Sequence, residues 1–152
     1  MRRWLKRSLV GVGVGLLAIQ LVPYGRAHAP RPIVAEPTWS SAEVRALAKR
    51  ACFDCHSNET RWPWYSNVAP VSWLVQHDVD EGREELDYSE WHGPTKASNK
   101  AAEEVRAGEM PPAMYLWMHP EARLSVEERE QLARGLPSGA APGPAKERAE
   151  SD

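Results

Sequence analysis

The sequence is poor in cysteine and phenylalanine, and it contains no alternating run of apolar and polar residues long enough to predict a β-strand. Its 152 residues include two cysteines, one phenylalanine and seven tryptophans. Two cysteines are too few for a disulfide framework. A formal net charge of −2 lacks the basic excess that a nucleic-acid-binding surface needs, so no nucleic-acid partner is expected. The length allows one domain with tails.

Positive charge is concentrated at the N-terminus. Residues 1–29 carry five basic side chains and no acidic one. Residues 30–152 therefore hold the other 14 of the 19 basic side chains against all 21 acidic ones, a net charge of −7. The basic cluster precedes an uncharged apolar run from Ser8 to Val22. This order is typical of an export signal.

The apolar run has two interpretations, a retained membrane anchor and a cleaved signal. Ala27-His28-Ala29 fits the small-x-small pattern of a cleavage site, but Pro30 at the next position is expected to hinder the cut. Counted from Trp4 to Tyr24, the segment is long enough to span a bilayer, with aromatic residues at both interfaces. We therefore favour a single-pass anchor in the bacterial inner membrane, with the domain facing the periplasm, over a soluble periplasmic protein.

Composition predicts four parts of the chain. A signal-anchor or transmembrane segment covers residues 1–23, and a proline-containing linker covers 24–37. The folded domain covers 38–136. A tail of Pro, Gly, Ala and charged residues covers 137–152 and is predicted to be disordered.

Helical spacing of apolar residues, together with capping residues, predicts four helices within the domain. The predicted fold class is therefore mostly α, a small helical domain preceded by one N-terminal helix. The four helices begin at Ser40 with Glu43 as capping partner, run from Pro70 to Leu86, run from Ser98 to Gly108, and begin at Ser125 with Glu128 as capping partner to end near Gly135.

The strongest motif is Cys52-Phe53-Asp54-Cys55-His56, directly after the first predicted helix. C-x-x-C-H is the attachment signature of a c-type haem. Two thiols three residues apart can each form a thioether with a vinyl group on the same edge of the porphyrin, and the adjacent imidazole can bind the iron. We therefore expect one covalently attached haem c at Cys52 and Cys55, with His56 as the proximal iron ligand.

Three other interpretations of the motif have less support. A redox-active C-x-x-C belongs to an α/β context, which the predicted helices do not provide. A structural zinc site needs two further ligands, and the domain offers only the isolated His77, His92 and His119. A lone disulfide across so short a loop adds little stability.

The opposite face of the iron is predicted to bind Met110. This residue lies in Glu109-Met110-Pro111-Pro112, where each proline forces the residue before it into an extended conformation. Such a stiff loop can hold a weak thioether ligand, and Met–His ligation suits electron transfer. A histidine, another methionine or an open position remain as alternatives. The other candidates are expected elsewhere: Met114 and Met118 in the core, and His77, His92 and His119 at the surface.

Tryptophan is the main aromatic residue of the domain. The densest cluster is Arg61-Trp62-Pro63-Trp64-Tyr65-Ser66, which begins five residues after His56. An indole combines a large apolar face with one N–H donor, which suits a crevice for a flat macrocycle with two propionates. We expect Trp62 and Trp64, with Arg61 or Arg83, to bind the haem and its propionates. Packing of a small core explains any single tryptophan equally well.

Seven segments of the domain form an ordered set of motifs: Cys52–Ser57, Arg61–Ser66, Ala69–Trp73, Glu81–Arg83, Ser89–Trp91, Glu109–Pro112 and His119–Ser125. Together they resemble a family of small bacterial haem-binding domains. The resemblance covers about residues 40–135, and members of the family are similar to membrane-anchored, single-haem c-type cytochromes. It implies a cytochrome c-like helical haem domain in which Cys52 and Cys55 attach the haem, His56 is the proximal ligand and Met110 is the distal ligand.

These observations predict a membrane-tethered electron carrier rather than an enzyme. The acidic charge of the exported part favours a redox partner protein with a basic docking face. Two alternatives remain: a haem-based ligand-binding or sensor module with a displaceable Met110, and a peroxidase-like enzyme with an open iron position. No residue points clearly to the distal acid–base group that a peroxidase needs.

Overall fold

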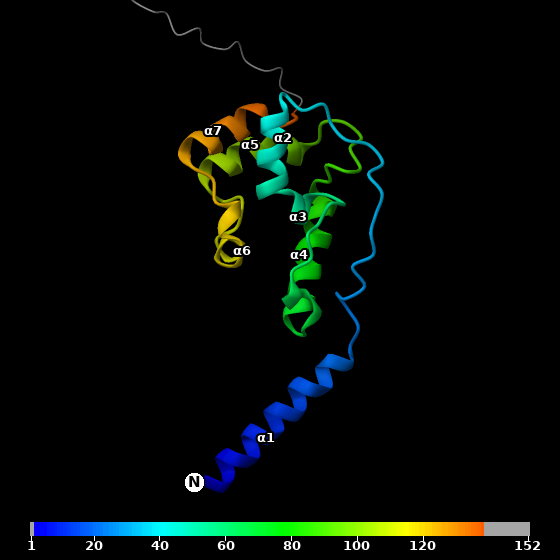
Figure 1. Ribbon diagram of the computed structural model, residues 1–152, viewed down its shortest axis with the longest axis vertical. Coiled ribbons are helices and arrows are strands. Elements are labelled where there is room, and N and C mark those ends of the chain that lie inside the picture. Colours follow the sequence, from blue (N-terminus) through cyan, green and yellow to red (C-terminus); the bar gives the residue numbers. More distant parts are fainter. Residues whose placement is uncertain (1, 139–152) are drawn as a thin grey trace, which may run out of the picture.

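The structure, a computed structural model, describes residues 2–138 (Figure 1). Within this range no strand forms beyond one isolated bridge between Ala35 and Glu90, so the predicted mostly α fold is confirmed. All but the first two residues of the tail predicted over 137–152 lie outside the described residues. In chain order the elements are α1 (Arg2–Ala18), η1 (Ile19–Leu21), α2 (Ala42–Ala51), α3 (Phe53–His56), η2 (Trp64–Asn67), α4 (Val71–Glu85), α5 (Lys96–Ala107), α6 (Ala113–Met118), η3 (Pro120–Ala122) and α7 (Val126–Gly135), where η marks a 3-10 helix.

Helix α1 and the 3-10 helix η1 form the predicted N-terminal helix, which extends away from the domain (Figure 1). The 20 residues Arg2–Leu21 are long and apolar enough to cross a membrane, with a mean hydropathy of 1.3, and their apolar window is not buried by the rest of the chain. Lipid can cover such a surface where the protein does not. Retention or cleavage of the helix stays a prediction.

Helix α2 begins one residue later than predicted. Its N-cap is Ser41, whose hydroxyl accepts a hydrogen bond from the Val44 amide, rather than Ser40. The hydroxyl of Ser40 instead donates to the carbonyl of Gly135 at 3.0 Å, at the end of α7. A side chain at position 135 would overlap Ser40 and Val44, so glycine permits the close approach of α7 to α2.

The other predicted helices are present, with one displaced start. Helix α5 begins after Thr95, which forms a capping box with Ser98, so the predicted start at Ser98 lies inside the helix. The predicted stop is confirmed, since Gly108 adopts a left-handed φ of 77°. Helix α7 begins with the predicted Ser125–Glu128 capping box. No helix is predicted from the sequence where α6 forms, since its six residues include no buried side chain and show no apolar periodicity.

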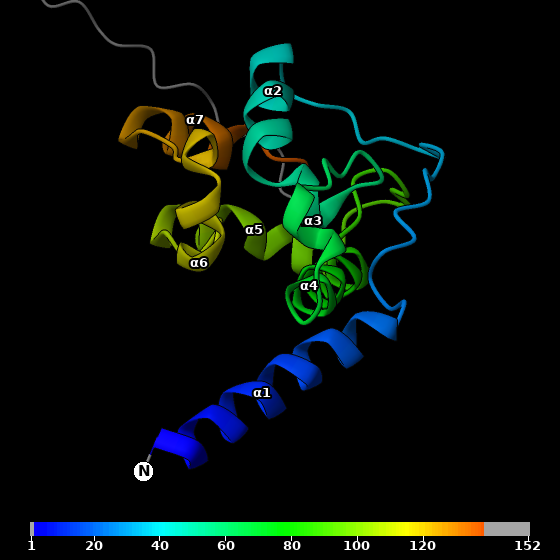
Figure 2. The same cartoon turned by 60° about the horizontal axis from the view of Figure 1, so that its bottom comes forward.

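The hydrophobic core lies where α2, α5 and α7 meet beside α3 (Figure 2). Phe53, between the two cysteines, is 2% exposed, and its ring centroid lies 5.9 Å from that of Tyr88. Trp39 and Trp91 pack against the core from its edge. The buried residues of the core are Val44, Ala48, Phe53, Leu86, Tyr88, Val105, Leu132, Ala133 and Leu136.

Residues 24–37, the predicted linker, run along the surface of the domain (Figures 1 and 2). The amides of Val34 and Ala35 both donate to the carbonyl of Ser89, at 2.9 and 3.1 Å. Near the start of the segment, the ring of His28 stacks on Trp62 with centroids 4.2 Å apart. The connection from α1 to the domain is therefore attached along its length.

Candidate functional site

The cysteine motif forms a tight helical turn directly after α2. Cys52 ends α2, and its carbonyl accepts hydrogen bonds from the amides of Cys55 and His56, at 3.2 and 2.9 Å. The two residues between the cysteines, Phe53 and Asp54, are buried, whereas the cysteines and His56 are partly exposed. Burial of the middle of the motif therefore fixes the turn and leaves the two cysteines and His56, the predicted haem-binding residues, partly accessible.

The imidazole of His56 is oriented by the C-terminal end of α4. Its Nδ1 lies 2.8 Å from the carbonyl oxygen of Gly82 and 3.0 Å from that of Leu86. A nitrogen between two carbonyls carries the proton and donates it, which leaves Nε2 as the nitrogen with a free lone pair. This is the arrangement that a metal-binding histidine needs, because the second ring nitrogen sets the orientation of the first.

Gly82 permits the contact between α4 and the motif. A Cβ at this position would lie 2.8 Å from the carbonyl oxygen of Cys55 and 3.0 Å from its Cβ. A side chain would therefore separate α4 from α3 and draw the Gly82 carbonyl away from His56. Gly82 is not among the site residues predicted from the sequence. The available signal was a glycine inside a predicted helix, which often marks a close approach of two backbones.

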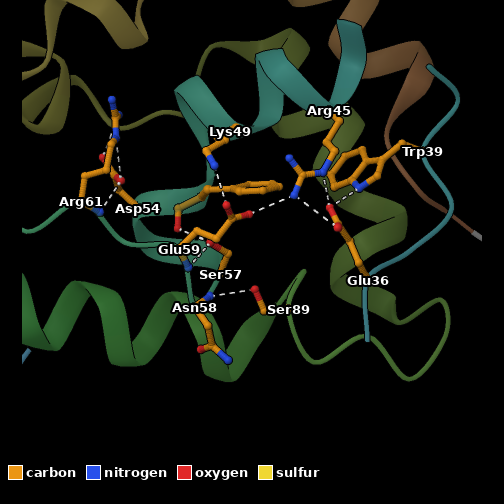
Figure 3. A network of polar contacts seen from close by, with 11 residues as sticks. Glu36, Trp39, Arg45, Lys49, Asp54, Ser57, Asn58, Glu59, Arg61 and Ser89 are labelled. Atoms are coloured by element: carbon orange, nitrogen blue, oxygen red, sulfur yellow. Dashed lines mark hydrogen bonds and ion pairs between the residues drawn. The ribbon is translucent and has the colours of Figure 1, made fainter. Parts of the chain in front are cut away.

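The two arginines predicted to bind propionates are both bonded within the protein. Arg61 donates to the carboxylate of Asp54 from its backbone amide, Nε and Nη2, at 3.0, 3.3 and 3.1 Å (Figure 3). Arg83 donates to the carbonyl of Ser57 and to the hydroxyl of Thr60, both at 2.9 Å. Both side chains thus hold the motif and the loop after it, and their contact with propionates stays a prediction.

Asp54 connects the motif to α6. Its carboxylate is 7% exposed and accepts a hydrogen bond from the hydroxyl of Tyr115 at 2.7 Å, in addition to those from Arg61. Burial and the hydrogen bond to Asp54 raise the pKa of Tyr115 well above its usual value. This contact joins residues 61 positions apart, so no local pattern in the sequence predicts it.

The two tryptophans predicted to bind the haem, Trp62 and Trp64, differ in solvent exposure. Trp62 is half-buried and stacks on His28, whereas Trp64 is 76% exposed on η2. Neither placement tests a contact with haem, so the haem-binding role of Trp62 and Trp64 stays a prediction.

Met110 lies between α5 and α6. It is half-buried against the hydrophobic core, and its amide bonds to the carbonyl of Glu104 at 3.3 Å, just after the left-handed Gly108. Its role as distal ligand stays a prediction. The prediction that Met114 and Met118 are core residues is wrong: they are 60% and 57% exposed, because α6 packs no side chain into the core.

The histidines predicted to be at the surface differ in their surroundings. His77 and His92 are exposed, as expected. His119 is instead enclosed: its Nε2 lies 2.7 Å from the hydroxyl of Tyr65, and its ring stacks on Tyr115 with centroids 4.2 Å apart. It therefore joins η2 to the end of α6, a contact that its position beside a proline in the sequence does not reveal.

The two thiols are not activated. Burial, with a smaller contribution from Cys55, raises the pKa of Cys52 to about 12, and burial together with Asp78 and Asp54 raises that of Cys55 to about 11. A redox-active C-x-x-C needs a lowered thiol pKa. Both cysteines are free, and among residues 2–138 no group of three or more His, Cys, Asp and Glu side chains is placed to hold a metal ion. The residues thus fit neither a redox pair nor a zinc site.

The residues present do fit a haem. Two free thiols lie one turn apart beside an imidazole with a fixed Nδ1. Apolar side chains that the protein leaves exposed, among them Leu74 on α4 and Met114 on α6, provide surface for a flat apolar ligand. Helices α4 and α6 lie on the side of the domain that faces α1 (Figure 2).

The helical fold and the C-x-x-C-H turn are those expected of a small haem-binding protein. The family model described as a haem-binding domain matches residues 14–137, so the chain belongs to this family. The match includes the end of α1 as well as the whole folded domain. No curated protein and no solved structure matches the chain.

Proposed function

We propose that the protein is a membrane-tethered c-type cytochrome that carries electrons on the periplasmic side of the bacterial inner membrane. In this proposal Cys52 and Cys55 attach the haem covalently, His56 is the proximal ligand and Met110 is the distal one. The observation that carries the proposal is the pair of carbonyl contacts to His56 Nδ1, which presents Nε2 beside the two free thiols.

When bound, the haem supplies a one-electron iron couple. The chain's own residues set its surroundings. The two carbonyls that accept from His56 Nδ1 keep the imidazole in one orientation. A neutral thioether from Met110 raises the reduction potential relative to a second imidazole. The bonds from Arg61 and Tyr115 to Asp54 hold the motif against α6, so both sides of the site keep a fixed geometry.

The partner of this electron carrier is proposed to be a redox protein with a basic docking face. Residues 30–152 carry a net charge of −7 before the propionates are added. Complementary charge accelerates encounter, and salt screens it. Electron transfer to a true partner should therefore slow as ionic strength rises, and transfer that is independent of salt would contradict this part of the proposal.

Optical spectra of the exported full-length protein and of Met110→Ala test the proposal. We expect a covalently bound haem with a near-infrared sulfur-to-iron band that Met110→Ala abolishes. Met118→Ala is the matched control, since Met118 is an exposed methionine of the neighbouring helix α6 with no assigned contact to haem, and it should keep the band. Absence of covalent haem would contradict the c-type assignment. Carbon monoxide binding to the reduced wild-type protein would instead support the ligand-binding alternative.

A further inference from the structure

Exposed apolar side chains gather at one end of the domain. Among residues 38–138, every exposed large apolar side chain except Val126 lies on η2 or at its C-cap Val68, on the first turns of α4, or on α6. These elements form the end of the domain nearest α1, whereas α2 and α7 lie farther from it (Figures 1 and 2). Trp64 and Trp117 are 76% and 79% exposed. The full set is Trp64, Val68, Val71, Leu74, Met114, Trp117 and Met118.

The same end is fastened to the exit of the N-terminal helix. Gln20, next to the last residue of η1, donates from Nε2 to the carbonyl of Ala69 at 2.8 Å and accepts from the Ala69 amide at 3.0 Å. Gly25, with φ of 75°, lies so close to the backbone of Ser72 that any side chain would overlap it. The junction of η2 and α4 is therefore held against the residues that immediately follow α1.

The length of the helix sets the level of this junction in a bilayer. Trp4 and Tyr24 are the expected interfacial residues, and the helical residues from Trp4 to Leu21 rise about 27 Å, close to the thickness of the hydrocarbon core, about 30 Å. Gln20 then lies where the chain leaves the hydrocarbon, and Ala69 lies at the same level. Tryptophan favours this interfacial region, because its ring is apolar and its N–H can bond to headgroups or water.

We propose that Trp64, Val68, Trp117 and Met118, here called the apolar face, rest in the headgroup region of the membrane that α1 crosses. In this proposal, lipid covers the apolar face, and the Gln20–Ala69 contact holds the face against the membrane. This inference rests on the proposed retention of α1 as an anchor, and it fixes the orientation of the domain on the membrane.

Photocrosslinking of the full-length haem protein with diazirine-bearing lipids tests the proposal. The protein is reconstituted in vesicles of phosphatidylethanolamine and phosphatidylglycerol, and lipid adducts are mapped by mass spectrometry of its peptides. We expect adducts on α1 and on peptides containing Trp64 and Trp117. The peptide containing Val126 should carry none. Val126 is the matched control because it is an equally exposed apolar residue, 78% exposed, at the start of α7.

The variant Gln20→Ala removes the contact with Ala69 and keeps the membrane anchor, so it tests the two contributions separately. It should reduce adducts at Trp64 severalfold and leave those on α1 unchanged. Adducts on α1 without adducts on the apolar face, or labelling of the face that Gln20→Ala does not alter, would overturn the proposal. A purified protein that lacks α1, or a protein that alkaline pH releases from the vesicles, would show that α1 is not a retained anchor. Either result would contradict the membrane tether of the proposed function, independently of the apolar face.

Discussion

Gly82 is the residue on which the geometry of the histidine most directly depends. In an exposed helix interior, Gly→Ala stabilises a protein by about 0.5–1 kcal/mol. At this position the added Cβ meets the backbone of Cys55 at 2.8 Å, and overpacking of this kind costs about 1–3 kcal/mol. We therefore expect Gly82→Ala to lower the free energy of unfolding, as measured by urea denaturation.

The control for this variant is Glu84→Ala, an exposed position on the same helix, which should stay within about 0.5 kcal/mol of the wild type. A stability of Gly82→Ala equal to or above that of the wild type would show that α4 can move away from the motif at no cost.

The hydrogen bond between Tyr115 and Asp54 is a second contact between single residues that is expected to stabilise the site. Tyr115→Phe removes the 2.7 Å hydrogen bond and leaves a buried carboxylate with one donor fewer. A hydrogen bond to a charged group contributes about 1.5–3 kcal/mol, so we expect a loss of that order in the free energy of unfolding. Tyr24→Phe, at an exposed tyrosine, is the control and should be silent. An unchanged stability of Tyr115→Phe would mean that the bond to Asp54 contributes nothing.

At the scale of elements, an ion-pair network joins the segment before α2, α2 itself and the loop after the motif (Figure 3). Arg45 bonds to Glu36 and, at 3.0 Å, to Glu59, and Glu59 also pairs with Lys49. These pairs are near the surface, so each is expected to contribute less than about 1 kcal/mol and to weaken with salt. The main effect of the network is therefore to fix the relative positions of these three segments, and its contribution to the free energy of unfolding is small.

The pH dependence of stability should report this network. Burial alone would raise the pKa of Glu59, but its bonds and charges from Lys49 and Arg45 prevail, and the pKa lies below its usual value. Its contribution is therefore present above the unfolded pKa of about 4.3 and is lost as pH falls through the folded pKa. We expect Glu59→Gln to reduce stability at pH 7 and to flatten the acid limb of a urea-denaturation series.

Gln131 on α7, which is exposed, offers a control site: Gln131→Glu should leave the acid limb close to that of the wild type. If the stability of Glu59→Gln fell with decreasing pH as steeply as that of the wild type, carboxylates other than Glu59 would be responsible for the acid sensitivity.

At the scale of the whole molecule, the domain leaves apolar surface on α4 and α6 that its own core does not cover. A bound haem would cover part of it. The double variant Cys52→Ser, Cys55→Ser should therefore lose covalent haem, bind an apolar dye and melt at least about 5 °C lower, which corresponds to about 1 kcal/mol for a domain of this size. Thermal unfolding followed by circular dichroism measures the shift. Ala46→Ser, at an exposed position of α2, is the control, and equal melting temperatures would contradict a structural role for the haem.

Local signals in the sequence were sufficient for most of the helices. Ser125 with Glu128 and the left-handed Gly108 act on backbone groups within four residues, so their effects are visible without a fold. The start of α2 was misplaced by one residue because the choice between Ser40 and Ser41 depends on Gly135, which is 95 residues away from Ser40. Helix α6 was missed because no side chain on it is buried.

The mostly α class and the apolar N-terminal helix follow from residue spacing within single short segments, and the same is true of the C-x-x-C-H motif that predicts the haem attachment. The groups that surround this motif depend instead on tertiary packing. The carbonyls of Gly82 and Leu86 at His56, the hydroxyl of Tyr115 at Asp54 and the attachment of Gln20 to Ala69 join residues 26 to 61 positions apart. Such contacts arise from the packing of one helix on another, and no local pattern of residues specifies them.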